Sequence, residues 1–491
     1  MAVGDGDICG LILAAGLSSR MGGSPKALLP LGGSTLLGQA AAALREGGVR
    51  DIRVVTGHCS DAVSIEAGRL GLAVIHNAAF ARGMFSSIRA GLSALPSSTR
   101  AVLLLPVDAA LVRGRSLAAL VGVWRQLPES RQETTVIIPA FGNRPGHPPL
   151  IGAAHLADIL ARDWEDGLRG YFSHLMRPDA ARKWLEEASA APVSSPPAFF
   201  SESAPGGELP MDVPMPSLEH PFPPVCLEAA SPDRPVYMLP LPDKGLICDI
   251  DTPQEYERAR DFLSATRGRS RPSPEEAWVW LCRSGLDGRK VLHSLQVALG
   301  ALRLGAALAG RGREINPGLH VCAGILHDIG RRFKEHARVV YAWGSAYGWE
   351  ECALAAGAHT VLPDPLLEAL GIPLRDVPVN SAGTLLSNVH IPAGYRNPSP
   401  ELLHACVCVY LADKHYSGRS LVSVEQRFAA VRRNFAGNSR TLECISRREA
   451  VAAAVRDALE GIVEERVDAL LCTACGHPLE RTVRDMFHEV E

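Results

Sequence analysis

A glycine-rich loop that carries two cations follows the first apolar run of the chain. The run Ile8–Leu13 has the composition of a buried strand, and the loop after it extends to Lys26. Glycines after a strand let backbone N–H groups approach phosphate oxygens, because no Cβ stands in the way. Arg20 and Lys26 would neutralise phosphate charge. The pattern predicts a loop that holds a nucleoside triphosphate, although it has neither the Gly-Lys-Ser/Thr phosphate-loop ending nor the Gly-x-Gly-x-x-Gly dinucleotide pattern.

Four more motifs follow this loop within the first 253 residues of the chain. They are Asn77 with Gly83-Met84-Phe85-Ser86-Ser87-Ile88 and Gly91, then Leu105-Pro106-Val107-Asp108, Gly146-His147-Pro148, and Asp249-Ile250-Asp251-Thr252-Pro253. Together with Leu13-Ala14-Ala15-Gly16-x-Ser18-x-Arg20-Met21-Gly22 and Lys26, they resemble the molybdenum cofactor nucleotidyltransferases. Within that family, Ala-Ala-Gly and Gly-His-Pro resemble the cytidylyltransferase branch more than the guanylyltransferase branch. The resemblance therefore implies CTP as the nucleotide, with GTP as the alternative.

The resemblance also implies roles for individual residues. The implied nucleotide-binding residues are Leu13, Ala14, Ala15, Gly16, Arg20, Lys26, Asn77, Ser86 and Ser87. The acceptor would be the phosphate of molybdopterin bearing molybdenum, which gives a dinucleotide cofactor and pyrophosphate, and a molybdoenzyme would then receive the cofactor. Gly146, His147 and Pro148 would help to form the acceptor pocket. His147 could equally be a loop residue that satisfies backbone groups.

Nucleotidyl transfer requires that charge be cancelled on the triphosphate and on the attacking phosphate, so Mg²⁺ and basic residues should dominate the mechanism. Asp108 closes an apolar strand and suits Mg²⁺, although it could instead be a turn or N-cap residue. The resemblance implies Asp251 as the second ligand, with Asp249 as the alternative, and both could instead cap the helix expected at Pro253. The predicted catalytic residues are therefore Lys26, Arg20 and Asp108, with Lys26 as the transition-state stabiliser.

A second set of metal-ligand residues lies in the C-terminal half, at His293, His327-Asp328 and Asp413. The segments Val321-Cys322-Ala323-Gly324-Ile325-Leu326-His327-Asp328-Ile329-Gly330 and Tyr410-Leu411-Ala412-Asp413-Lys414 resemble the HD phosphohydrolase superfamily. The resemblance implies that these four residues bind a divalent metal. Imidazole with carboxylate suits Mn²⁺, Fe²⁺, Ni²⁺ or Zn²⁺, and such a metal would activate water against a phosphoester.

Three further observations qualify this C-terminal site. Arg331 stands where many HD members carry Lys. His359 and His390 are possible extra ligands for a second metal, but the sequence shows no partner for either. The region could hydrolyse a nucleotide phosphoester, or it could be a degenerate regulator that keeps its metal without turnover.

The elements that position these residues follow from hydrophobic periodicity. Apolar runs alternate with amphipathic helical stretches up to about residue 160, which predicts a Rossmann-like α/β domain with a mostly parallel sheet. The later strands are expected at Ile52–Val55, Ala73–Ile75, Ala101–Leu105, Thr135–Ile138, Val236–Leu239 and Leu246–Ile250. In such sheets ligands collect at the carboxyl ends of strands, so the Gly16 loop and Asp108 should face one cleft.

Composition then divides the chain into domains. We expect a nucleotidyltransferase domain at 7–265, a linker at 266–274 and an all-α HD domain at 275–491. A proline- and serine-rich stretch at about 189–235 is expected to be a disordered or extended insertion within the first domain.

Charge and cysteine usage exclude several classes of protein. The net charge of -3 gives no electrostatic case for binding nucleic acid. No stretch approaches the ~18 apolar residues of a membrane span, and no leader is evident, so a cytoplasmic protein is expected. The 12 scattered cysteines fit reduced thiols. Cys472 and Cys475, with His477, could form half of a zinc site, but a second pair of ligands is missing.

Two other functions remain open at this level. Related nucleotidyltransferases act on a sugar phosphate or another phosphorylated small molecule, but Gly146-His147-Pro148 weighs against that substrate class. A module that binds and delivers molybdenum cofactor without catalysis is the alternative from another class. Lys26, Asp108 and Asp251 weigh against a silent site.

Overall fold

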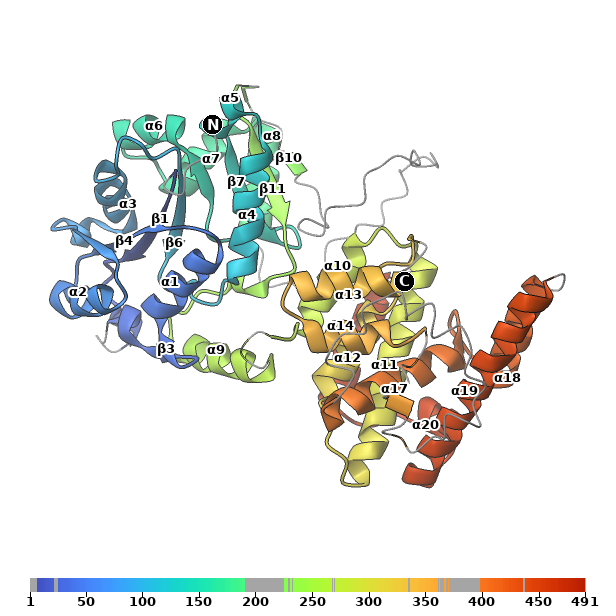
Figure 1. Ribbon diagram of the computed structural model, residues 1–491. Helices are drawn as coiled ribbons and strands as arrows, with labels where there is room; N and C mark the ends of the chain where they lie inside the picture. The colour runs from blue at the N-terminus through green and yellow to red at the C-terminus, as the bar shows by residue number, and fades with distance from the viewer. Residues whose placement is uncertain are drawn as a thin grey trace. The chain divides into compact units, whose positions relative to one another are not determined.

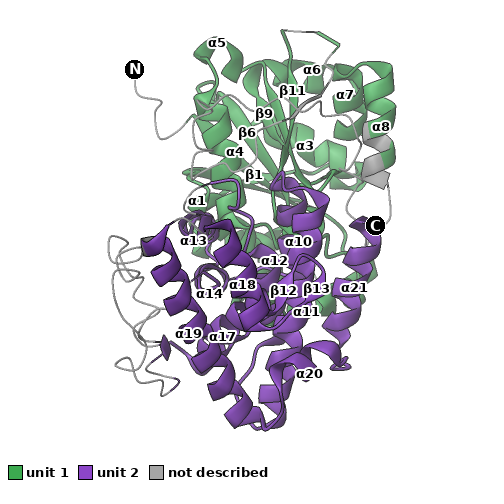
Figure 2. Cartoon of the chain, turned by 90° about the vertical axis from the view of Figure 1, so that its right-hand side faces the viewer, with its two compact units in different colours: residues 1–197, 209–268 green, residues 198–208, 269–491 purple. Residues whose placement is uncertain are grey.

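A computed structural model of the chain describes residues 7–21, 25–189, 225–227, 230–231, 233–266, 268, 270–333, 336–360, 362, 366–367, 370, 398–435 and 438–490. The chain divides into two compact units, which Figure 2 shows in separate colours. Unit 1 comprises residues 1–197 and 209–268, and unit 2 comprises residues 198–208 and 269–491.

Unit 1 is built on a mixed nine-stranded sheet with the order β10-β11-β7-β9-β6-β1-β4-β5, and β8 pairs with β7 at the side. The strands are β1 (Ile8–Ala14), β4 (Asp51–Thr56), β5 (Ala73–His76), β6 (Ala101–Pro106), β7 (Val136–Phe141), β8 (Arg144–Pro145), β9 (Leu150–Gly152), β10 (Val225–Leu227) and β11 (Val236–Pro240). The longest ladders are parallel and join β1 to β4 and β6. Strands β8, β9 and β10 run antiparallel to their neighbours.

Helices cover both faces of this sheet (Figure 1). The described helices of unit 1 are α1 (Leu36–Glu46), α2 (Ser60–Arg69), α3 (Met84–Ser93), α4 (Gly114–Gln126), α5 (Glu129–Gln132), α6 (Leu156–Ala161), α7 (Leu168–Leu175), α8 (Pro178–Ser189) and α9 (Pro253–Ala265). Buried side chains of β1 alternate between two cores. Ile12 packs into the core on the α1 and α4 side, and Leu11 packs into the core on the α3 and α7 side. The predicted α/β fold is therefore confirmed.

The run Leu246–Ile250 is not a strand, so that prediction is wrong. Residues Lys244–Ile247 form a short 3₁₀ helix, η5. The buried carboxylate of Asp243 turns the chain there, because it accepts hydrogen bonds from the backbone N–H groups of Arg113 and Gly245 at 2.8 and 2.9 Å. The expected insertion at 189–235 also contains β10 near its end, and its residues 190–224 lie outside the described part of the chain.

Unit 2 is helical, as predicted. Its described helices are α10 (Pro274–Arg283), α11 (Gly288–Gly310), α12 (Pro317–Leu326), α13 (His336–Ala346), α14 (Glu350–Gly357), α17 (Pro400–His415), α18 (Val424–Asn434), α19 (Ser439–Val463), α20 (Val467–Cys472) and α21 (Pro478–Val490). Helix α11 packs against α12, α17 and α21. A two-stranded hairpin, β12 (Tyr416–Ser417) with β13 (Ser420–Leu421), is a small departure from the all-α expectation.

Helix α11 corrects the expectation that no segment is long and apolar enough to cross a membrane. Its 23 residues pass that test by length and composition. However, 72% of its most apolar window is buried inside the protein, which is typical of the core helix of a helical domain.

Two candidate active sites

The first candidate site is a cavity of about 330 Å³ at the carboxyl ends of β1 and β6. Its wall contains most of the predicted nucleotide-binding residues, namely Leu13, Ala14, Ala15, Gly16, Arg20, Lys26 and Ser87. Asp108 and Asp251 line the same cavity. The glycine-rich loop and the two predicted metal ligands thus face one space, as expected for the strand ends of an open α/β sheet.

Lys26 lies between the two carboxylates of this cavity. Its Nζ is 3.4 Å from Oδ2 of Asp108, and it also forms a close ion pair with Asp251. Arg20 pairs with Asp251 at 3.2 Å from the outer side, where its side chain is 70% exposed. The side chains of Lys26 and Asp108 are only 15% and 20% exposed, so their charges interact with little screening. When a triphosphate and Mg²⁺ bind, Lys26 and Arg20 would leave these ion pairs and contact phosphate oxygens instead.

The loop itself is fixed by Ser18. This residue has a left-handed φ of +50°, and its Oγ accepts a hydrogen bond from the backbone N–H of Lys26 at 3.0 Å. This bond holds Lys26 beside Ser18, and both residues line the first cavity. Gly22, which belongs to the motif, lies outside the described residues.

Asp251 is not the cap of the helix that follows it. Thr252 is the N-cap of α9, and its Oγ1 accepts a hydrogen bond from the N–H of Glu255 in a capping box. The carboxylate of Asp251 therefore stays directed at Lys26 and Arg20. The backbone N–H of Ile250 donates to the carbonyl of Asp108 at 3.2 Å, which ties this segment to the end of β6.

Asn77 and Ser86 are absent from the described wall of the cavity. The amide of Asn77 donates hydrogen bonds of 3.0 Å to the hydroxyl groups of Ser86 and Ser87. Its own oxygen accepts a bond from the N–H of Ala79. These contacts fix the first turn of α3 beside the cavity, which is a positioning role in this structure.

The predicted acceptor segment lies on a second cavity of about 520 Å³. Gly146, His147 and Asp249 line this cavity, whereas the wall includes Pro149 and not Pro148. Met84 and Pro106 line both cavities, so the two spaces adjoin. Asp249 faces the second cavity and Asp251 the first, which separates the two carboxylates that the sequence could not distinguish.

Gly146 is required by close backbone packing, which gives a testable contrast with Gly16. A Cβ at Gly146 would lie 2.2 Å from the carbonyl oxygen of Leu246, an atom that already accepts the N–H of His147 at 2.7 Å. We expect Gly146→Ala to lower the free energy of unfolding by about 1–3 kcal/mol. A Cβ at Gly16 would meet no atom within 4 Å.

Gly16→Ala should therefore leave stability unchanged while it narrows the first cavity. Denaturant unfolding monitored by circular dichroism compares the two variants. Equal unfolding midpoints would contradict the packing argument.

Asp108 gives a prediction about pH. Burial raises the pKa of Asp108, Asp249 and Asp251 raise it further, and Lys26 and His147 oppose the rise. A carboxyl with a raised pKa in the folded state destabilises that state once pH exceeds the pKa of the unfolded chain. We therefore expect Asp108→Asn to unfold at a higher temperature than the unchanged protein near pH 7, with the difference vanishing near pH 4.

Thermal denaturation in EDTA between pH 4 and pH 8 measures this difference. Asp261→Asn, at an exposed position on α9, is the matched control and should show no such trend. A difference for Asp108→Asn that is independent of pH would contradict the argument.

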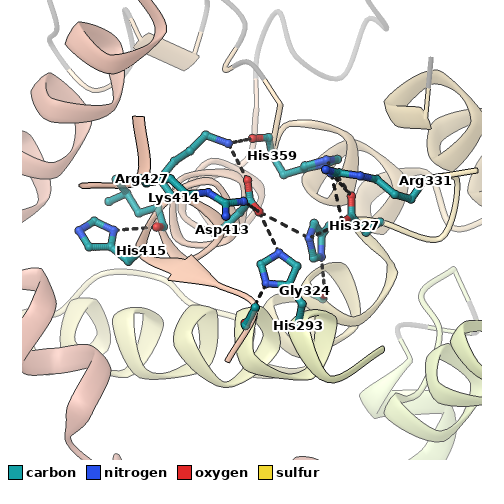
Figure 3. Close-up of polar contacts among 12 residues, drawn as sticks. His293, Gly324, His327, Arg331, His359, Asp413, Lys414, His415 and Arg427 are labelled. Carbon is teal, nitrogen blue, oxygen red and sulfur yellow. Dashed lines mark hydrogen bonds and ion pairs between the residues drawn. The ribbon is translucent and has the colours of Figure 1, made fainter. Parts of the chain in front are cut away.

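The second candidate site lies among α11, α12 and α17 of unit 2 (Figure 3). Nε2 of His293 is 3.2 Å from Oδ1 of Asp413, and Nε2 of His327 is 3.8 Å from the same oxygen. His293, His327 and Asp328 form a group whose ligand atoms all lie within 4.8 Å of one another. The four predicted ligands are thus brought together, and we name His293, His327 and Asp328 the first metal group.

His327 is oriented as a metal ligand requires. Its Nδ1 is bonded to the carbonyl of Gly324 at 2.7 Å, and its buried Nε2 has no hydrogen-bond partner among the described residues. Burial lowers the pKa of His327, so the ring is neutral at pH 7 and can offer a lone pair. A Cβ at Gly324 would lie 2.5 Å from the Cα of Ala298, so glycine allows α12 to approach α11 this closely. Imidazole nitrogens with carboxylates fit a transition metal.

A second group shares Asp328. Its members are Asp328, His336 and His359, again with ligand atoms within 4.8 Å of one another. Nε2 of His336 and Nε2 of His359 are 3.7 and 3.6 Å from Oδ1 of Asp328. Burial lowers the pKa of His359 to about 3, so this ring is also neutral at pH 7. Asp328 can therefore bridge two metals, and we name these three residues the second metal group.

Sequence reasoning missed His336 and left His359 without a partner. His336 opens α13 and His359 follows α14, so their separation of 23 residues has no helical or motif spacing. His390, the other possible ligand, lies outside the described residues. Arg331 lies 3.2 Å from Oδ1 of Asp328 and is half exposed, so its position beside the metal groups suits a phosphate contact.

The Cys472 and Cys475 pair does not form a metal group. Cys475 donates a hydrogen bond from its Sγ to Glu480, and both cysteines are free thiols. Among the described residues, the groups that could hold a metal do not include either cysteine or His477.

Comparison with known proteins divides the chain in the same way as the two sites. Residues 10–181 match the family described as MobA-like NTP transferase domain, and residues 291–415 match the HD domain. A curated relative, the nicotine blue oxidoreductase of Paenarthrobacter nicotinovorans, is 38% identical over 92 residues, which are 18% of this chain and 45% of that protein. The chain thus spans about half the length of the curated relative that it matches.

The chain is also similar to two solved structures. A nucleotidyl transferase from Methanothermobacter thermautotroptrophicus is 20% identical with a TM-score of 0.35, covering 53% of this chain and 98% of that one. Molybdopterin-guanine dinucleotide biosynthesis protein A from Archaeoglobus fulgidus is 16% identical with a TM-score of 0.30. The match covers 52% of this chain and 98% of that one.

Proposed function

We propose that this chain, in which a MobA-like NTP transferase domain precedes an HD domain, transfers CMP from CTP to the phosphate of molybdopterin-bound molybdenum cofactor. The observation that carries the proposal is the arrangement of Lys26 between Asp108 and Asp251, in a cavity that adjoins a second, larger one. We assign the nucleotide to the first cavity and the acceptor to the second. The choice of CTP and of this acceptor comes from the motif resemblance.

The reaction forms one bond and breaks one. An oxygen of the acceptor phosphate attacks the α-phosphorus of the nucleotide, the bond from that phosphorus to the bridging oxygen breaks, and pyrophosphate leaves. Asp108 and Asp251 would hold Mg²⁺, which supplies positive charge to the triphosphate. Lys26 and Arg20 neutralise the remaining phosphate charge, and Lys26 is placed to stabilise the transition state because it is the more buried of the two.

The HD domain supplies the second part of the proposal, which is hydrolysis of a phosphoester at the metal groups of unit 2. His293, His327, Asp328 and Asp413 would hold the metal, with His336 and His359 completing a second group. A bound Mn²⁺, Fe²⁺, Ni²⁺ or Zn²⁺ supplies an activated water. A regulator that binds metal without turnover is the alternative. Hydrolysis of generic phosphomonoesters and phosphodiesters that is unchanged when His327 and Asp328 become alanine would support the regulator.

The nucleotidyltransferase proposal is tested by pyrophosphate release. The purified full chain is incubated with Mg²⁺, molybdenum cofactor and CTP, GTP or ATP in separate reactions. We expect release that depends on the cofactor and is fastest with CTP. Release with GTP but not with CTP or ATP would change the proposed nucleotide from CTP to GTP. Absence of release with all three nucleotides would reject the transferase proposal.

A protein that binds and delivers the cofactor to a molybdoenzyme remains the candidate from another class. Binding of CTP without pyrophosphate release would favour it. We further propose a cytoplasmic location, which matches the reduced state expected of the scattered cysteines. Fractionation of the cells that produce the protein tests this location.

A further inference from the structure

The second cavity contains two arginines that the predicted acceptor segment did not include. Arg144, on β8, and Arg169, in the first turn of α7, both line it. Neither side chain forms an ion pair or hydrogen bond with any residue that the structure describes. Nε of Arg144 and Nδ1 of His147 are buried and have no hydrogen-bond partner among the described residues. Buried donors without partners are costly, so this arrangement indicates a bound group that satisfies them.

The first turn of α7 adds to the positive character of this wall. The helix begins after Gly167, which has a left-handed φ of +60° and provides no side-chain cap. Gly167, Leu168 and Arg169 all line the second cavity. The N-terminal end of α7, which is the positive end of the helix dipole, therefore lies at the same wall as the two arginines. Asp166 and Asp249 also line the cavity, but neither forms an ion pair with Arg144 or Arg169.

The rest of the wall is apolar. It includes Phe85, Ile88, Leu104, Ile138, Phe172 and Leu246. A sugar offers little apolar area to such a surface, whereas an aromatic ring system buries apolar area against it. The volume of about 520 Å³ is large enough for a ring system with a charged substituent.

We infer that the second cavity binds an acceptor that combines an apolar ring system with an anionic group, and that Arg144, Arg169 and the first turn of α7 hold the anionic group. This inference rests on the proposed function, because it takes the second cavity as the acceptor site. It adds two specificity-determining residues and predicts that phosphorylated sugars without an aromatic ring system bind more weakly. A phosphate and a carboxylate share the chemistry that this wall recognises.

The test uses flavins as probes of this ligand class. FMN and riboflavin share a planar ring system and differ by one phosphate, and glucose 1-phosphate offers a phosphate on a polar body. Binding to the full chain is measured by flavin fluorescence and by calorimetry. We expect FMN to bind at least about tenfold more tightly than riboflavin, and glucose 1-phosphate to bind more weakly than FMN.

Variants then assign the contacts. Arg144→Ala and Arg169→Ala should each weaken FMN binding about tenfold or more and leave riboflavin binding unchanged. Arg69→Ala, at an exposed position on α2 that lines neither cavity, is the matched control and should change neither. A riboflavin analogue with a carboxylate in place of the phosphate shows which anion is preferred, and either preference agrees with the inference.

The outcomes separate this inference from the proposed function. Equal binding of FMN and riboflavin, or glucose 1-phosphate binding as tightly as FMN, would overturn it. So would displacement of FMN by CTP with Mg²⁺, because the probe would then occupy the first cavity. Titration of CTP with Mg²⁺ is run alongside: failure of CTP to bind refutes the nucleotidyltransferase, whereas CTP binding with no discrimination among the probes refutes only the acceptor class.

Discussion

Replacing Lys26 by alanine is expected to lower nucleotide-dependent pyrophosphate release by about 100- to 1,000-fold. Its Nζ lies between Asp108 and Asp251, at the carboxyl ends of the strands that form the first cavity. The side chain is only 15% exposed, so its charge acts on a triphosphate through a poorly screened environment. Removing a single preorganised charge from such a position has this order of effect on the chemical step.

The reaction is followed under saturating nucleotide, so that the loss falls on turnover and not on binding alone. Lys26→Arg should retain part of the activity, because arginine keeps the charge but has a planar head with different geometry. Lys183→Ala, at an exposed lysine of α8, is the matched control and should react at the unchanged rate. Turnover by Lys26→Ala within about threefold of the unchanged protein would remove Lys26 from the mechanism.

The Lys26 variant also has an effect that loss of folding would not produce. Without the Nζ cation, Asp108 and Asp251 lose their shared ion-pair partner and repel each other more strongly. Mg²⁺ or Mn²⁺ should therefore bind the nucleotide-free variant more tightly than it binds the unchanged protein. A variant that binds metal but does not turn over is folded and lacks only the transition-state charge.

The strand positions and the first cavity illustrate how far sequence reasoning reaches. The strand that ends at Asp108 and the loop after β1 were predictable because buried parallel strands have continuous apolar runs and their carboxyl ends meet at one edge. The run Leu246–Ile250 has the same composition, yet the buried carboxylate of Asp243 holds it in a turn. The hydrogen bonds of Asp243, which lies outside the run, hold this segment in a turn, and the composition of the run does not predict those bonds.

The same limit explains why the two histidines of the second metal group were not predicted as a pair. His293, His327, Asp328 and Asp413 belong to motifs. His336 lies on α13 and His359 lies just after α14, and these segments meet only in the folded unit. The arginines of the second cavity were missed for a related reason. Arg144 and Arg169 lie on β8 and α7, and only packing against η5 and α3 encloses one cavity between them.

Replacing Asp328 by alanine should remove metal from both groups of unit 2, because its carboxylate is the one ligand that the two groups share. Burial raises the pKa of Asp328, but His327, His359 and Arg331 outweigh burial and lower it to about 2, so the carboxylate is ionised at pH 7. Loss of a residue that only orients a ligand costs about 10- to 100-fold in metal affinity, and loss of the shared ligand should cost at least about 100-fold at each group.

Histidine variants distinguish the two groups and so test whether Asp328 holds a metal in both. His293→Ala should remove the metal of the first group only, and His336→Ala that of the second only, because each ring belongs to one group. His488→Ala, at an exposed histidine of α21, is the matched control. Metal bound per chain is measured by elemental analysis after dialysis against Mn²⁺. Equal losses in Asp328→Ala and His336→Ala would contradict a bridging role for Asp328, because the first group would then hold its metal without this carboxylate.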